Sequence, residues 1–336
     1  MDRPLGCSGK DDAVVGRRSL RLVASNGEIS GGPGGPVKAK RLALDPQDTQ
    51  DEAIARILSN CLDHFTANAP ALRAIGDPEA VHQSRVALRR LRAFLGLLKQ
   101  AMPTLDLSAT AAQAKAIAGA LGDTRDWDVL REGLEKGPRS FLGDEPAFYA
   151  LLDEIELRRH QARDAARAAI SSPQTYRFVN ELRQIIARRP WREHGKDTGA
   201  KGSARALAIK ALNRLHRRAV KKCDGVASFP PERRHEARIA LKKARYGAEF
   251  FESLFSGKDA RAYLRDLAMI QDQLGDENDR ATAARLLKEI TEADVAQKTM
   301  RAAWFLEGWR ARADSQSGGA VRLAERRLRK LKPFWR

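Results

Sequence analysis

Two segments of the sequence repeat one arrangement of residue types that bind anions. HQSRVALRRLR (82–92) and HEARIALKKAR (235–245) each place Arg or Lys three, seven, eight and ten residues after a His. On a helix the cations at three, seven and ten residues return to the face of the His, whereas Arg90, at eight, lies beyond the other side. A row of like charges on one face is unfavourable unless an anion offsets it. A solvated helix face normally mixes both signs. The repeated row therefore predicts an anion-binding site in preference to a merely solvated surface.

A helical wheel places this basic row beside a predicted core face, which Leu88, Leu91, Leu95 and Leu98 fill. In the second copy, Glu249 lies four residues after Arg245 and is predicted to pair with it. We expect the cations to start at the border of the core and to reach outward. The predicted binding residues are His82, Arg85, Arg89, Arg90, Arg92 and Lys99 in the first copy, and His235, Arg238, Lys242, Lys243 and Arg245 in the second.

A second motif keeps the spacing of the first. The basic segments are 153 residues apart, and LGDTRD (121–126) recurs at the same offset as LGDEND (274–279). Two separate motifs in one register predict that a unit of roughly 150 residues has been duplicated.

Composition narrows the class of partner. The chain has 336 residues, a formal net charge of +18, 43% hydrophobic and 6% aromatic residues. Such a charge predicts a polyanion or an anionic surface as partner, which leaves acidic lipid, nucleic acid and polyphosphate open. The three cysteines lack metal-ligand spacing, no run of 18 apolar residues occurs, and no apolar signal segment opens the chain. These patterns predict a cytoplasmic protein without a membrane span, disulfide, metal or cofactor.

The hydrophobic pattern predicts an all-α fold. From Asp48 onward apolar residues recur at helical spacing, and no segment alternates with a period of two. Prolines, among them Pro70, Pro103 and Pro173, are predicted to separate the helices. Residues 1–45 are rich in Gly, Pro and Ser and are predicted to be flexible.

The repeated motifs resemble those of a known family. VHQSRVALRRLR and RRHEARIALKKARYGAEFF, each followed by LGD-x-x-D, are similar to the CHAD family (conserved histidine α-helical domain) over about residues 47–336. The resemblance implies two antiparallel four-helix-bundle halves, 46–192 and 200–336, related by pseudo-twofold symmetry around a basic groove. It also implies binding of inorganic polyphosphate without catalysis, which leaves open either association with polyphosphate granules or regulation of polyphosphate metabolism. Residues 36–53 are similar to the linker after a CYTH domain, whose ExExK signature is absent.

Supporting charge is predicted from the first helix of the second half, KALNRLHRRAVKK (210–222). The residues concerned are Lys210, Arg214, Arg217, Arg218 and Lys221. The corresponding helix of the first half offers only Arg56 and His64. We therefore expect an asymmetric site.

Two alternative functions remain open. The motif carboxylates Asp123, Asp126, Asp128, Asp276 and Asp279 could serve as metal ligands of a phosphohydrolase. They could instead cap helices and pair with Arg, which is favoured because no HD pair, HExxH or Gly-rich phosphate loop accompanies them. Nucleic acid is the rival ligand, although few aromatic residues are interleaved with the basic row for base stacking.

The C-terminal run RLAERRLRKLKPFWR (322–336) is a basic amphipathic segment. We predict that it packs onto the second half through Leu323, Leu328 and Trp335, and that it does not lie on a membrane.

Overall fold

The computed structural model describes residues 35–136, 138, 145–193, 202–274, 276–293, 296–314 and 318–336. In chain order the helices are α1 (Gln50–Ile75), α2 (Pro78–Ala101), α3 (Ser108–Ala120), α4 (Gly122–Lys136), α6 (Pro146–Ile170), α7 (Pro173–Arg188), α8 (Ala204–Cys223), α9 (Pro231–Phe251), α10 (Gly257–Gln273), α11 (Asp276–Thr291), α12 (Gln297–Asp314) and α13 (Gly318–Lys330), with 3-10 turns η1 (Pro190–Arg192), η2 (Val226–Ser228) and η3 (Glu252–Leu254). Within these ranges there is no strand, only an isolated bridge between Thr49 and Ser203. The predicted all-α fold is confirmed. Among the described helices, none is long and apolar enough to span a membrane.

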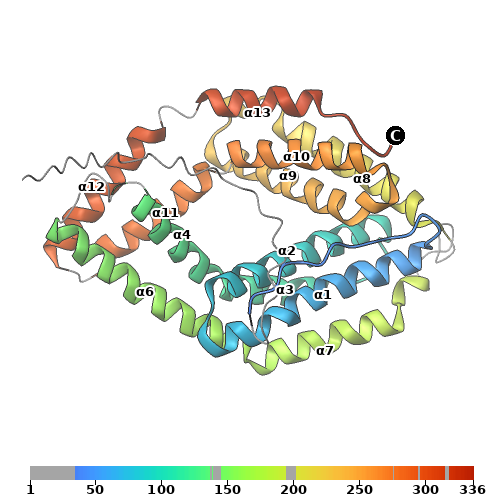
Figure 1. Cartoon of the computed structure of the whole chain (residues 1–336), viewed down its shortest axis with the longest axis horizontal. Helices are drawn as coiled ribbons and strands as arrows, with labels where there is room; N and C mark the ends of the chain where they lie inside the picture. The colour runs from blue at the N-terminus through green and yellow to red at the C-terminus, as the bar shows by residue number, and fades with distance from the viewer. Residues whose placement is uncertain are drawn as a thin grey trace, which may run out of the picture.

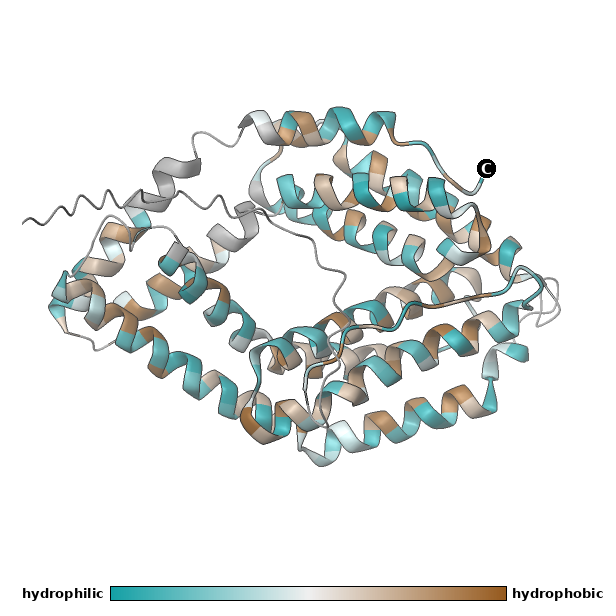
Figure 2. Ribbon diagram, viewed as in Figure 1, coloured by the Kyte–Doolittle hydropathy of each residue, from teal (hydrophilic) through white to brown (hydrophobic). Residues whose placement is uncertain are grey.

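The helices form three groups (Figure 1). One contains α1, α2, α3 and α7, and a second contains α8, α9, α10 and α13. The third combines α4 and α6 with α11 and α12, so it takes two helices from each predicted half. Most helices carry both hydrophobic and hydrophilic residues along their length (Figure 2), as amphipathic packing requires.

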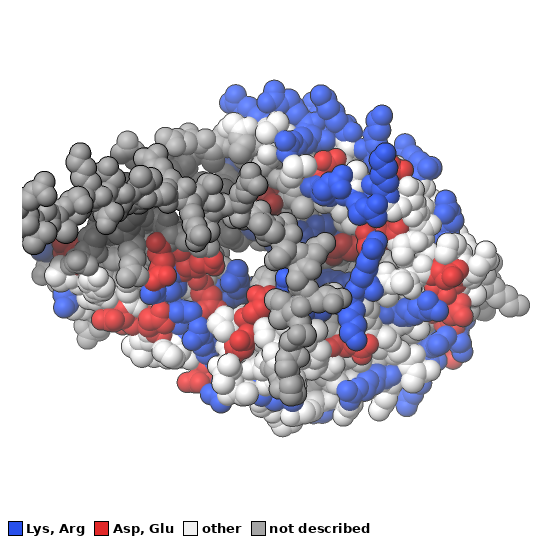
Figure 3. Space-filling model, in the orientation of Figure 1, with Lys and Arg blue, Asp and Glu red and all other residues white. Residues whose placement is uncertain are grey.

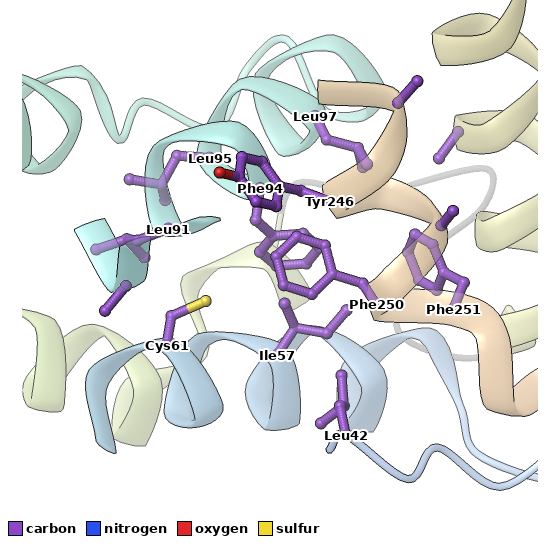
Figure 4. Close-up of a cluster of buried hydrophobic side chains, with 14 of the residues drawn as sticks. Leu42, Ile57, Cys61, Leu91, Phe94, Leu95, Leu97, Tyr246, Phe250 and Phe251 are labelled. Atoms are coloured by element: carbon purple, nitrogen blue, oxygen red, sulfur yellow. The ribbon is translucent and has the colours of Figure 1, made fainter. Parts of the chain in front are cut away.

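Two hydrophobic cores hold these groups together. The larger core extends through the first two groups, and α2 meets α9 within it. There Phe94 packs edge-on against Phe250 at 5.4 Å between ring centroids, beside Ile57 and Leu97 (Figure 4). The smaller core joins α4, α6, α11 and α12 through residues such as Trp127 and Leu286. Both cores cross the boundary between the predicted halves.

Helix starts agree with the predicted repeat, although the duplication itself remains a prediction. Pro78 and Pro231, at which α2 and α9 begin, are 153 residues apart, and Pro at the first helical turn loses no helix hydrogen bond. Thr49 and Ser203 each cap the helix that follows by accepting a backbone N–H. The boundary predicted at Pro70 is wrong, because α1 continues through Pro70 to Gly76, whose φ of 62° ends the helix.

Residues 35–45 differ from the predicted flexible segment. Leu42 and Leu44 are buried in the larger core. The Leu44 N–H donates to Ser253 Oγ at 2.8 Å, and Arg41 pairs with Glu252 at 2.9 Å. This segment therefore binds the turn η3 that follows α9, which the hydrophobic pattern alone could not indicate. Residues 1–34 lie outside the described ranges.

Asp51, in the first turn of α1, anchors the end of α7. Its carboxylate accepts hydrogen bonds from Trp191 Nε1 at 2.7 Å, Arg189 Nη1 at 2.7 Å and Arg192 Nη2 at 2.6 Å. Arg189 has a φ of 51°, a left-handed conformation that these contacts stabilise. Burial alone would raise the pKa of Asp51, but the hydrogen bonds from Arg192, Arg189 and Trp191 outweigh it and hold the pKa below its usual value.

Asp51→Ala is expected to lower the free energy of unfolding at neutral pH by about 1–3 kcal/mol, because charged hydrogen bonds are lost. Since the folded-state pKa is depressed, this contribution exists above the unfolded-state pKa of roughly 3.9 and disappears as pH falls through the folded value. Denaturant titrations at neutral and acidic pH measure both effects. The exposed Asp63 on the same helix supplies the control Asp63→Ala. Equal losses in the two variants would contradict the anchoring role.

Candidate functional site

The basic row on α2 lies at the border of the core, as predicted. Leu88, Leu91 and Leu95 are buried, whereas Arg92 and Lys99 are exposed and the other row members except Arg90 are half-buried. Asp77 caps the helix by accepting the Ala80 N–H. Pro78 follows it at the first helical position, so the sequence fixes where the row begins.

Arg85 binds the loop that carries the LGD motif. Its Nη1 donates to the Leu121 carbonyl at 2.9 Å, and its Nη2 lies 3.9 Å from Asp126 Oδ1. A Cβ on Gly122 would meet Arg85 Nη1 at 3.2 Å, which is tight. The motif glycine thus permits close approach of α4 to α2.

Arg125, which the sequence prediction missed, belongs to this group. Burial is the largest cause that lowers the pKa of His82, and the charges of Arg125, Arg89 and Arg85 lower it further, while Glu79 opposes them. The pKa of Arg85 is also lowered, chiefly by burial, with Arg89 and Arg125 contributing. The repeat offered no signal for Arg125, because Asn278 stands at the corresponding position of the second copy.

A second cationic group forms where α2, α8 and α9 meet. Burial lowers the pKa of Lys243, followed by the charges of Arg218 and Arg92. Arg89 Nη1 lies 3.5 Å from the hydroxyl of Tyr246 on α9. Among the described residues, Arg92, Lys243 and Arg218 form no ion pair with a carboxylate. The helices α2, α8 and α9 therefore each contribute one positive charge to the same cluster, through Arg92, Arg218 and Lys243.

The α9 row has different surroundings. His235 is exposed, Arg238 and Lys242 are half-buried, and all three have interaction partners. Arg245 Nε donates to Glu249 Oε1 at 2.9 Å, which confirms the predicted pair, and its Nη1 donates to Gln271 at 3.1 Å. The charges that act most strongly on His82 come from α2 and α4 and not from α9. The structure therefore joins the two rows through their later residues, Arg92 and Lys243.

The α8 cations lie on the exposed side of that helix. Arg214 Nη1 donates to the Gln100 carbonyl at 3.1 Å and so links α8 to the end of α2. The other predicted residues of this region are exposed: Lys99, Lys210, Arg217, Arg218 and Lys221. Figure 3 shows Lys and Arg gathered over the upper part of the molecule and beside a hollow near its centre.

Arg90 is the predicted site residue that lies inside the core. Only 5% of it is exposed, and its guanidinium lies over the Phe250 ring at 5.2 Å. Its Nε and Nη1 have no hydrogen-bond partner. It contributes to packing between α2 and α9 and is not part of the exposed row.

The first-half counterparts of the α8 cations contribute little, as expected for an asymmetric site. Arg56 pairs with Asp48 at 3.1 Å. His64 is buried against Gln83, and desolvation lowers its pKa to about 4.

The motif aspartates of the first copy bind arginines. Asp126 lies 3.2 Å from Arg285 on α11, and the buried Asp128 accepts hydrogen bonds from Arg159 at 2.8 and 3.0 Å. Asp123 is exposed. The side chains of Asp276 and Asp279 lie outside the described residues. Over the described residues, no three His, Cys, Asp or Glu side chains are grouped to hold a metal ion.

The C-terminal run packs as predicted through Leu328 and Trp335, which are buried, whereas Leu323 is 37% exposed. Trp335 Nε1 donates to Asn213 at 3.0 Å. The tail therefore packs against α8 at Asn213 and His216.

These features define an all-helical protein with cations clustered between helices from both halves of the chain. The sequence matches the CHAD domain family over residues 56–288. The fold is similar to that of the crystal structure of the CHAD domain from the plant Ricinus communis, with a TM-score of 0.78, 30% identity, and coverage of 89% of this chain and 98% of that chain. PptA from Streptomyces chartreusis shares the fold with a TM-score of 0.60, 19% identity, and coverage of 84% and 100% respectively. The chain matches none of the curated proteins with which it was compared.

The chain belongs to the CHAD domain family, so the resemblance seen in the sequence motifs is confirmed.

Arg125→Gln is expected to raise the pKa of His82, because removal of a neighbouring positive charge favours the protonated imidazole. An NMR titration of the histidine ring signals measures the shift. Arg131→Gln, on the same helix but paired with Glu156 at 2.9 Å, is the matched control and should leave His82 unchanged. An unchanged His82 titration in Arg125→Gln would remove Arg125 from the site.

Proposed function

We propose that this protein binds inorganic polyphosphate through the clustered cations of α2, α4, α8 and α9, and that it does so without catalysis. The observation that carries the proposal is that Arg92, Lys243 and Arg218 approach one another from three helices. Among the described residues none of the three forms an ion pair, although the charge of Arg218 also acts on Glu236. The three positive charges repel one another when no ligand is bound. A bound anion relieves this repulsion, and the relief favours binding.

Polyphosphate has the chemistry that these side chains recognise. Its phosphates repeat along a flexible line, so one chain can contact cations on several helices in turn. Arg can donate two parallel hydrogen bonds to phosphate oxygens, and Lys supplies a compact charge. Family membership supports this choice, because the motifs of the CHAD family imply polyphosphate binding. Association with polyphosphate granules would follow from the same interaction.

Binding is favoured over hydrolysis by the partners of the motif aspartates. Asp126 and Asp128 each bind arginine side chains, which is the structural role that the sequence also favoured for the motif aspartates. Release of phosphate from polyphosphate in the presence of Mg²⁺ or Mn²⁺ would favour the phosphohydrolase alternative.

Polyphosphate is favoured over nucleic acid by the aromatic residues at the cluster. Tyr246 and Phe250 are buried within the contact between α2 and α9, so they offer no face to a base. Competition of labelled polyphosphate against DNA and RNA at physiological salt distinguishes the ligands.

Affinity for polyphosphate is expected to fall steeply with ionic strength, because each phosphate contact releases a condensed counterion. A plot of log Kd against log salt should have a slope of about 0.7–0.9 per contact. Arg92→Gln should reduce this slope by about one contact, since Arg92 lies within the cluster. An affinity that does not change between low and physiological salt would contradict the electrostatic proposal.

Charge reversal in one helix is expected to weaken binding by the whole protein. Arg92→Glu and Lys243→Glu should each lower affinity by about tenfold or more at low salt while one chain still binds per protein, because both side chains contact that chain. Isothermal titration with a long chain measures affinity and stoichiometry separately.

The control for charge reversal is Arg177→Glu with Arg188→Glu, two exposed residues of α7, which Figure 1 places on the opposite side of α1 from α9. Their reversal changes only the long-range field, which salt screens. Arg85 is unsuitable for this test because it also holds the Leu121 carbonyl. Half the stoichiometry at unchanged affinity would mean that α2 and α9 form independent sites.

A further inference from the structure

A pocket with an apolar floor opens between α2 and α8, beside the cationic cluster. Its floor is formed by Ala93, Leu97, Leu207, Ala211 and Leu215. Three cations, Lys210, Arg214 and Lys243, and the amide of Gln100 stand around it. Inorganic polyphosphate has no apolar part, so this floor has no role in binding it.

Gly96 keeps the mouth of the pocket open. It lies in the interior of α2, where Gly is less stable than Ala, and a Cβ built on it has no atom within 4 Å. A larger side chain at this position would project into the pocket space. The sequence thus leaves a void where a helix would ordinarily carry a side chain.

The cations continue from the pocket toward the cluster. Lys210, Arg214 and Arg218 are four residues apart on α8 and so form one line along that helix. Arg218 and Arg92 both act on Lys243, which is itself at the pocket rim. A ligand with an apolar group in the pocket would therefore have its charged end among these cations.

We propose that this pocket binds a nucleoside polyphosphate, with the base on the apolar floor and the phosphates along Lys243, Arg218 and Arg92. A planar base suits a lining of small and branched aliphatic side chains, and the Gln100 amide can meet its polar edge. The site uses cations that the proposed function also uses, but its apolar floor is an independent feature.

The test compares two ligands that differ in the base. Tripolyphosphate carries at least as much charge as ATP, so electrostatics alone predict that it binds as tightly. We expect ATP, without added metal, to bind about tenfold more tightly than tripolyphosphate, because the base buries apolar surface. Isothermal titration of the whole protein at one ionic strength measures both.

Gly96→Phe fills the pocket and should reduce ATP affinity to that of tripolyphosphate, while tripolyphosphate affinity stays unchanged. Gly119→Phe is the matched control, since Gly119 is a helical glycine on α3 that also has open space around its Cβ. Thermal unfolding of each variant verifies the fold, and Gly96→Ala, which leaves most of the pocket open, should retain the ATP preference.

Three outcomes would overturn the pocket assignment. They are equal affinity of the native protein for both ligands, equal weakening of both ligands by Gly96→Phe, and an ATP preference that Gly96→Phe leaves intact. The proposed function fails separately, if long-chain polyphosphate itself does not bind.

Discussion

Packing of α2 against α9 determines where the charges of this protein lie. Phe94 and Phe250 meet edge to face, and Arg90 covers the Phe250 ring from within the core. Because the apolar faces of both helices are directed at each other, the neighbouring basic faces must emerge on either side of the contact. Arg92 and Lys243 emerge close enough to affect one another. The cationic cluster is a consequence of this helix pair.

Some cations of this region are held in place by ion pairs with carboxylates, whereas others form no ion pair and can bind a ligand. Asp126 lies between Arg85 and Arg285 and so ties α2 to α4 and α11, while Glu249 orients Arg245. These pairs position the helices around the cluster. Among the described residues, Arg92, Lys243 and Arg218 form no such ion pair. The paired arginines therefore shape the site, and the cations without an ion pair can bind an anion.

The chain also joins its two halves through features remote from the site. Residues 35–45 contact the turn η3 that follows α9, and the backbone of Gln50 donates to the Gly202 carbonyl at 2.6 Å. α6 extends from the larger core at Ile170 to the smaller one at Phe148. These connections hold α2 and α9 in one arrangement, which a site built from several helices needs.

The sequence by itself determined the helical class, the buried face of α2 and the pairing of Arg245 with Glu249, because helical periodicity and i,i+4 spacing are local properties. It also located the basic rows, since the motifs repeat. It could not show that Arg90 points into the core. A helical wheel gives the direction of a side chain relative to its own helix, but it does not show which neighbouring helix packs on that side. Arg125, the segment 35–45 and the pocket at Gly96 were decided by tertiary structure alone, since each depends on residues brought together from distant parts of the chain.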